Sequence, residues 1–504
     1  MKKILLILAL FVSFGFAGCD MLETKSEDKL SGDEFWNKGN AKDVESFLLS
    51  LYNTFRKATM IDCPFITFSG DMRCAPITTY SSGDSPYVNH LATNDMSGLR
   101  NRYPNVDDWR GGLIMHWKLF FEVVQEANIL LFEIDKVPSL TSQEVNMFKA
   151  EAIFMRNLSY FFMVRAFGDV PYYTNAYNED PLPRTDMLTV LQNCLNDLQP
   201  LIDNDPDAEA LPWTYSSLSK KGIRASRGSV IALMMHINLW LVQFDNNSKN
   251  QYYQNVIALG EELERNANAY SLIEIERTAV IFRGGSSEGL FEIAQNINTK
   301  EIFRTEAIFS NNVSYSCLNI ARPRYFYSGD FFSTIFPVYE NDLRKELWFD
   351  ENIYSNSNLT IKEIKKFWNI DTYNSGTITS NSGNQIVFRY ADVLLLYAEA
   401  LAALGVDDAK ACGLLNQIRR RAHASDINAS GNELMDAIFW ERTRELIGEG
   451  HYYYDLVRTG KVYNRNYCAN SMTRTNFNAG AWTWPIHRNA LQNNTGMVLN
   501  LYWE

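Results

Sequence analysis

Residues 285–289, Gly-Ser-Ser-Glu-Gly, have the spacing that surrounds the serine nucleophile in many hydrolases. That nucleophile needs a strand before it and a helix after it, because the sharp turn between them exposes the hydroxyl. Here the apolar residues 289–294 follow the motif and indicate a strand. Five-residue motifs have a high false-positive rate, so we interpret this one as a chance match.

The six histidines and seven cysteines offer no metal-ligand spacing. No two histidines stand four residues apart, as two ligands on one helix face would, and no two cysteines are separated by two residues. The glycine-rich motifs of nucleotide enzymes are also absent from the sequence. We therefore expect no catalytic residue, no metal and no cofactor. A glycoside hydrolase stays open as an alternative, because its two carboxylates leave no sequence signature.

Aromatic residues in polar loops point to binding instead. Sugars present flat C–H faces, which aromatic rings cover, and a rim of hydroxyls, which Asp, Asn, Arg and Gln bind. The candidate ligand-binding residues are Tyr103, Asp108, Trp109 and Arg110 in one loop, followed by Tyr315, Arg322 and Tyr325 in another. Trp213 and Tyr215, in a connector, are a third choice. Each ring could instead anchor its own loop to the protein.

Helical periodicity dominates the rest of the chain and predicts a mainly α fold. Apolar residues recur at steps of three and four, and Thr141 and Glu144 form a capping box. Residues 58–112 lack periodicity, and a loop this long is usually functional. Helices are predicted at 44–55, 117–131, 141–166, 191–202, 226–241, 252–265, 389–404, 408–421 and 432–449, with short strands such as 289–294 and 385–388 between them.

Three charged residues, Arg389, Asp392 and Glu399, fall in the otherwise apolar helix 389–404. An unpaired buried charge is costly. We therefore expect partners from the charged segment 441–451, and we interpret these charges as structural ion pairs rather than as a ligand site.

The N-terminal residues have a pattern that is typical of a targeting segment. Lys2 and Lys3 precede an apolar run, residues 4–16, which ends in small residues at Cys19. This resembles a bacterial lipobox, in which the cysteine is lipidated, and the run is shorter than the roughly 20 residues of a membrane span. We expect residues 1–18 to be a signal peptide and 19–40 a lipidated tether. The formal net charge of −12 argues against nucleic acid as a partner.

Two long segments, 388–401 and 441–460, resemble the C-terminal signatures of the SusD/RagB family. The first reads Phe-Arg-Tyr-Ala-Asp-Val-Leu-Leu-Leu-Tyr-Ala-Glu-Ala-Leu. Residues 167–171, Phe-Gly-Asp-Val-Pro, resemble another signature of the family. The tail resembles the closing motif but departs from it at His487 and Ala490, where proline and glutamate are usual.

The resemblance implies tetratricopeptide-like helix pairs in a right-handed superhelical scaffold, with long loops and a few short strands carrying the ligand site. It implies an N-terminal helical region, 41–268, and a C-terminal region, 269–504, packed as one globular unit. Family-level matching does not reach the aromatic loops, so no ligand residue is carried over.

The same resemblance implies a Bacteroidetes lipoprotein of the outer membrane that faces the cell surface. Such a protein would capture a glycan without chemistry and deliver it to a TonB-dependent, SusC-like transporter. A peptide receptor of the RagB kind is the alternative within binding. An anchored glycoside hydrolase and a helical-repeat scaffold remain alternatives of other classes.

Overall fold

The computed structural model describes most of the chain from residue 32 onward. The described residues are 32–60, 65–79, 86–102, 116–203, 210–295, 325–351, 362–367, 370–373, 378–381, 383–492 and 494–504. Residues 32–38, which we expected in the tether, form helix α2 (Gly32–Lys38). Its Trp36 is buried and packs edge-to-face on Phe47, with ring centroids 5.1 Å apart. The folded body therefore includes residues that come before residue 40.

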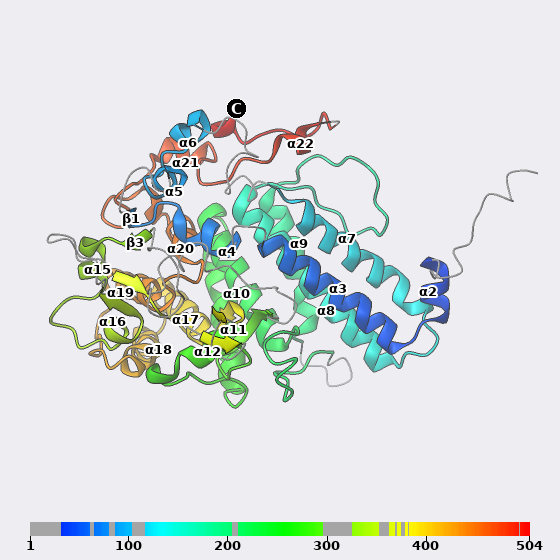
Figure 1. Cartoon of the computed structure of the whole chain (residues 1–504), viewed down its shortest axis with the longest axis horizontal. Helices are drawn as coiled ribbons and strands as arrows, with labels where there is room; N and C mark the ends of the chain where they lie inside the picture. The colour runs from blue at the N-terminus through cyan, green and yellow to red at the C-terminus, as the bar shows by residue number, and fades with distance from the viewer. Residues whose placement is uncertain are drawn as a thin grey trace, which may run out of the picture.

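Long helices form the scaffold. They are α3 (Ala41–Met60), α7 (Lys118–Glu133), α8 (Ser142–Phe167), α9 (Met187–Leu198), α10 (Arg227–Phe244), α11 (Lys249–Arg265), α17 (Tyr390–Leu404), α18 (Asp408–Arg421) and α19 (Gly431–Glu445). Helices that follow one another in the chain pack side by side, and α11 carries the stack across to α17 (Figure 1). This arrangement confirms the prediction of a mainly α fold built from helix pairs.

Shorter helical segments complete the fold. They are α4 (Phe65–Thr67), η1 (Phe68–Met72), α5 (Pro86–Ala92), α6 (Met96–Arg102), η4 (Ile134–Lys136), η5 (Gln199–Leu201), η6 (Ile275–Arg277), α12 (Ala279–Arg283), α15 (Gly329–Ile335), α16 (Arg344–Leu347), α20 (Tyr452–Arg458), η10 (Lys461–Tyr463), α21 (Arg474–Asn478), α22 (Arg488–Leu491) and η11 (Leu501–Trp503). No described helix combines the length and the apolar character that crossing a bilayer requires.

The strands are short and antiparallel. One sheet has the order β1 (Ile77–Thr79), β3 (Tyr325–Tyr327), β5 (Lys362–Ile364), β4 (Phe349–Glu351), and two strand pairs join β2 (Gly289–Ile293) to β8 (Gln385–Arg389) and β6 (Ile370–Tyr373) to β7 (Ile378–Asn381). Because β1 belongs to the first half of the chain and β3 to the second, this sheet ties the two halves together.

The core is centred on two helices that are buried on all sides. Every residue of α10 from 227 to 242 is buried, and so is every residue of α17 from 391 to 402. A helix without a polar face must be covered from several directions. Capping follows the sequence: the Thr141 hydroxyl accepts from the Glu144 backbone N–H (3.2 Å), and α8 ends at Gly168, whose φ is +77°.

Arg389 is the hub of a buried ion-pair network. Its guanidinium lies 2.7 Å from Glu288, 2.6 Å from Glu445 and 2.7 Å from Glu449, and all four side chains are buried. Two of the three partners come from residues 441–451, as expected from the sequence. These buried charges tie together the residue before β2, the junction of β8 and α17, and the C-terminal end of α19.

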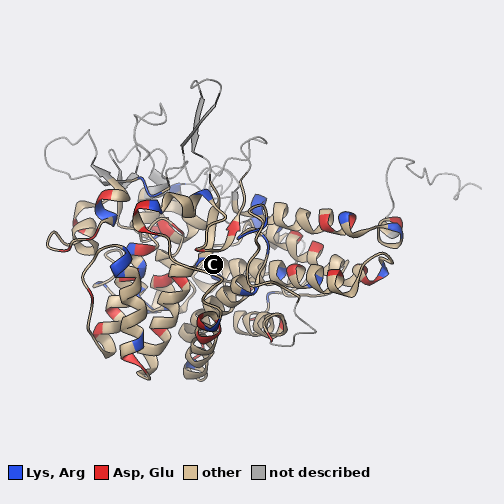
Figure 2. Cartoon of the chain, turned by 90° about the horizontal axis from the view of Figure 1, so that it is seen from below, with Lys and Arg blue, Asp and Glu red and all other residues tan. Residues whose placement is uncertain are grey.

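The other two charges of α17 are also paired. Asp392 accepts from Arg442 at 2.8 Å, whereas Glu399 forms a two-pronged pair with Arg458 (2.6 and 2.9 Å), which belongs to α20 rather than to α19. These contacts support the structural interpretation of the charges. Outside the network, acidic and basic residues are interspersed along the described helices (Figure 2).

Candidate functional site

Most of the aromatic residues proposed from the sequence fall outside the described part of the chain. Residues 103–115, which include Tyr103, Asp108, Trp109 and Arg110, and residues 296–324, which include Tyr315 and Arg322, are not described. Tyr325 opens β3, where it pairs with Thr79 of β1. Sequence order places the first of these loops immediately before α7.

The third choice, Trp213 and Tyr215, holds its connector to the scaffold. The Tyr215 hydroxyl donates to the Ala225 carbonyl at 3.2 Å, and the Arg227 guanidinium lies 5.2 Å from the centre of the Trp213 ring. Both rings therefore act in the packing of the connector against the start of α10.

A pocket of about 470 Å³, here called the aromatic pocket, lies at the start of α7. The N-terminal residues of α7 line one side, and the C-terminal tail lines the other. Its lining residues are His116, Trp117, Lys118, Phe121, Glu122, Gln125, His487, Asn489 and Ala490.

Helical spacing brings the α7 side of this pocket together. Trp117, Phe121 and Gln125 stand four residues apart, so they share one face of the helix. Trp117 is 9% exposed and packs edge-to-face on Phe121 and on Phe167, each with ring centroids 5.5 Å apart. Phe121 is half-buried and stacks on Tyr173 (6.1 Å, 16°). Packing thus holds the ring of Phe121 in place at the pocket.

The tail contributes His487, one of the two departures from the family's closing motif. Its ring lies 3.8 Å from that of His116, centroid to centroid, and is 3% exposed. Its Nδ1 accepts from the backbone N–H of Asn489 at 3.2 Å, which caps α22. A proline at this position would have no side-chain acceptor for the Asn489 N–H and no aromatic ring to lie against His116.

The polar residues of the aromatic pocket surround these rings. Lys118 is exposed and Glu122 half-buried, and their charged groups lie 3.5 Å apart. Gln125 Oε1 is buried yet accepts no hydrogen bond from any described residue. A buried acceptor without a donor costs free energy, and a ligand hydroxyl or a water in the pocket would supply that donor. Rings beside a polar rim suit a sugar, and nothing in this set forms a nucleophile–base pair.

The sequence predicted the helix that carries Trp117 and Phe121 but not this pocket. Phe121 was expected only as part of a helix, His116 was expected to have no role in a metal site, and His487 was noted as a departure from a motif. The pocket joins residues about 370 positions apart in the chain. That departure was the one signal in the sequence that pointed to the tail.

Three buried residues, His236, Asp392 and His451, lie close enough for a metal cluster, within 4.8 Å of one another. Asp392 already accepts from His236 Nε2 at 2.7 Å and from Arg442. Burial opposes the charge of Asp392, but His236 and Arg442 outweigh it and hold the pKa of its carboxyl well below the usual range. Because neighbouring groups satisfy both carboxylate oxygens, this donor set fits a structural cluster better than a metal site.

The serine motif at 285–289 is also structural. Ser286 is buried, and its hydroxyl accepts from the backbone N–H groups of Glu288 (3.1 Å) and Gly289 (3.2 Å). The motif therefore forms the turn that opens β2, in agreement with the interpretation as a chance match.

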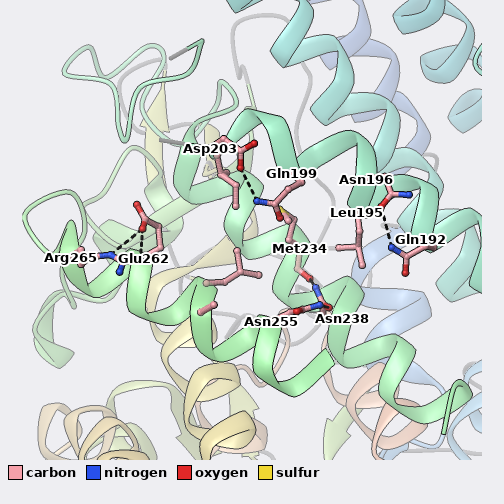
Figure 3. A pocket seen from close by; sticks show the side chains of 13 residues that line it. Gln192, Leu195, Asn196, Gln199, Asp203, Met234, Asn238, Asn255, Glu262 and Arg265 are labelled. Atoms are coloured by element: carbon pink, nitrogen blue, oxygen red, sulfur yellow. Dashed lines mark hydrogen bonds and ion pairs between the residues drawn. The ribbon is translucent and has the colours of Figure 1, made fainter. Parts of the chain in front are cut away.

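A second pocket, here called the amide groove, lies on α10 between α9 and α11 (Figure 3). It has a volume of about 370 Å³. Its lining residues are Gln192, Leu195, Asn196, Gln199, Ile202, Asp203, Met234, Asn238, Asn255, Ala258, Leu259, Glu262 and Arg265. Unlike the aromatic pocket, it has no ring in its lining.

The chain matches two family models and several known proteins. The model of the SusD family matches residues 339–503, and a model described as "Starch-binding associating with outer membrane" matches residues 75–234. SusD-like protein P38 of Formosa agariphila is 24% identical over 99% of both chains. A laminarin-binding SusD-like protein, 21% identical with a TM-score of 0.70 over 92% of this chain and 99% of its own, shares the fold.

A crystal structure of a SusD homologue from Bacteroides thetaiotaomicron is far more similar. It is 72% identical to this chain, covers 93% of it and 100% of its own length, and superposes with a TM-score of 0.87. Identity of this degree over nearly the whole length confirms the resemblance seen in the two C-terminal signatures. The chain belongs to the SusD family.

Proposed function

We propose that this protein is a lipid-anchored receptor of the outer membrane that binds a glycan at the cell surface and delivers it to a TonB-dependent, SusC-like transporter. Membership of the SusD family supports the glycan and the membrane association, since one matching model is described as starch-binding and associated with the outer membrane. The lipobox-like end of residues 1–18 at Cys19 supports the anchor.

The observation that carries the glycan assignment is the aromatic pocket. Phe121 and the two histidine rings present apolar surface, while Glu122 and Gln125 Oε1, which accepts from no described residue, offer acceptors for hydroxyl groups. A peptide receptor would use the same pocket for aromatic side chains, and it remains the second candidate. Trp109 and Arg110, in the segment immediately before His116, remain the proposed ligand residues of the adjoining loop.

A glycan array probed with the full mature chain tests this function. We expect retention of one class of polysaccharide or its oligosaccharides, with no release of shortened products on long incubation. Release of shortened glycan would favour the anchored hydrolase. An array without a hit, together with binding of tryptic peptides, would favour the peptide receptor.

Delivery to a transporter is tested separately by co-purification from detergent-solubilised outer membranes. A stable complex with a β-barrel protein is expected. Recovery of the protein alone, with growth on the bound glycan unaffected by its deletion, would exclude the delivery role.

A further inference from the structure

The amide groove carries an array of side-chain amides from three helices (Figure 3). Gln192, Asn196 and Gln199 come from α9 and the turn that follows it, Asn238 from α10 and Asn255 from α11. A carboxamide offers two N–H donors and a carbonyl oxygen with two lone pairs. It therefore matches a ligand that also alternates donors and acceptors.

Internal hydrogen bonds orient these amides. Along α9, Gln192 donates to Asn196 at 3.2 Å, and just beyond it Gln199 donates to Asp203 at 3.0 Å. Each bond spans four residues, so the side chains lie along the helix rather than projecting freely into solvent. Restriction of this kind lowers the entropy lost when a ligand binds.

The amides of Asn238 and Asn255, on α10 and α11, form a second oriented set. Asn255 donates to Asn238 Oδ1 at 2.9 Å, and Asn238 donates to the backbone carbonyl of Met234 at 2.8 Å. Gln251 donates to Asn255 Oδ1 at 2.9 Å, so the half-buried Asn255 amide keeps one N–H and one lone pair for a ligand. Asn238 is 1% exposed and serves to orient Asn255.

Aliphatic side chains lie between the amides. Leu195, Ile202, Met234 and Leu259 are each less than 9% exposed and line the groove. They offer an apolar floor to a side chain but no flat ring to a sugar face. The lining therefore favours an alternating chain with polar main-chain groups and aliphatic side chains over a carbohydrate.

The spacing along the helices agrees with an extended peptide. Residues four apart on a helix are separated by about 6 Å along its axis, and an extended chain repeats every two residues at about 6.6–6.8 Å. Along α11 the lining runs from Asn255 to Arg265, ten residues or about 15 Å. That length accommodates four to five extended residues.

The charges of the groove select among peptides. Asp203 and Glu262 are acidic, and Arg265 lies 2.6 Å from Glu262, so the lining has a formal charge of about −1. An acidic segment would be repelled at the end where Asp203 lies. A neutral or basic segment would not.

We propose that the amide groove binds an extended polypeptide segment of four to five residues that is neutral or basic and carries an aliphatic side chain for the groove floor. The segment belongs to a partner polypeptide, and its main-chain groups bind the amides of α9 and α11. This proposal does not depend on glycan binding at the aromatic pocket.

Panning a display library of random heptapeptides against the full mature chain tests the proposal. The test variant is Gln199→Ala with Asn255→Ala, two exposed or half-buried amides of the groove. The matched control is Gln254→Ala, an exposed amide on α11 that does not line the groove. Enriched peptides, made synthetically, are then titrated against all three proteins by calorimetry.

We expect enrichment of peptides with aliphatic and basic residues, at least a tenfold loss of affinity for the double variant, and unchanged affinity for the control. Failure to enrich any peptide would overturn the proposal, as would equal affinity for the double variant. If the double variant instead loses binding to a glycan that the wild type retains, the groove is a sugar site and the peptide assignment is wrong. Peptide binding that survives Phe121→Ala would separate this groove from the aromatic pocket.

Discussion

His487 is one of the two positions at which the tail departs from the closing motif that it resembles, and its ring lies against His116 in the aromatic pocket. Its ring nitrogen also caps α22. A single departure from that motif thus marks a residue that lines the aromatic pocket.

The buried ion pair of Glu399 gives a prediction about a single residue. Replacing Glu399 by alanine leaves Arg458 buried and short of its two-pronged partner. Breaking one side of a buried pair typically costs about 3–5 kcal/mol, and we expect a loss of that size in the free energy of unfolding, measured with urea. Arg444→Ala serves as the contrast. Arg444 is partly exposed and contacts Glu441 at 3.2 Å. Without Arg444, the Glu441 carboxylate still pairs with Arg344 and Arg419. Equal losses for the two variants would contradict this account.

The sequence predicted the helices, because periodicity is a local property, and the segment 441–451 that supplies two of the three partners of Arg389, because an unpaired buried charge is costly. The sequence did not predict the third partner, Glu288. It did not predict that Arg458, rather than a residue of α19, pairs with Glu399, since that choice depends on how α20 is placed. The aromatic pocket was missed for the same reason: His116 and His487 meet only through the tertiary fold.

At the scale of elements, η1 and the turn before α20 make a close backbone contact. A Cβ on Gly70 would overlap the carbonyl group of Gly450, whose own φ is +82°. Glycine is required at both positions, one for space and the other for conformation.

Gly70→Ala is therefore expected to lower the free energy of unfolding by about 1–3 kcal/mol or more. A Cβ on Gly413, inside α18, would meet no other atom within 4 Å, so Gly413→Ala should raise the free energy of unfolding by about 0.5–1 kcal/mol. Urea titrations of both variants check this pair. A Gly70→Ala protein as stable as wild type would show that η1 and the turn are not in close contact.

The ion-pair network between α17, α19 and α20 predicts a pH dependence. Burial opposes the charges of Glu441 and Asp455, but nearby arginines outweigh it, chiefly Arg344 for Glu441 and Arg442 for Asp455, and lower both pKa values to about 2. A carboxyl with a lowered pKa contributes stability above its unfolded value, near 4.5 or 3.8, and loses it as the pH falls toward 2.

The urea midpoint should accordingly change little on account of these two groups above about pH 5 and fall steeply between about pH 4.5 and 2. Asp455→Asn should lower stability at pH 7 and flatten part of that fall. An identical pH profile for Asp455→Asn and wild type would show that Asp455 does not contribute to it.

At the scale of the whole molecule, the proposed function requires an anchor that the described residues do not include. Residues 1–18 and Cys19 carry the lipobox-like pattern. Two or more acyl chains on Cys19 would hold the protein firmly at a bilayer. We expect Cys19→Ala to move the protein from the membrane fraction to the soluble fraction, as followed by immunoblotting. Retention of the variant in the membrane to the wild-type extent would rule out lipidation of Cys19 as the anchor.

The central claim is that the aromatic pocket binds a glycan. Calorimetry of the full mature chain, with a glycan identified on the array, tests it most directly when wild type is compared with Phe121→Ala. Phe132→Ala is the matched control, because Phe132 is a 61% exposed ring on the same helix that does not line the pocket. Thermal melting of all three proteins separates binding from folding.

We predict that Phe121→Ala weakens binding by about 2 kcal/mol or more, as loss of an aromatic hot spot does, while Phe132→Ala binds as wild type does and both variants remain folded. Wild-type affinity in a folded Phe121→Ala protein would contradict the account and remove the aromatic pocket from the ligand site.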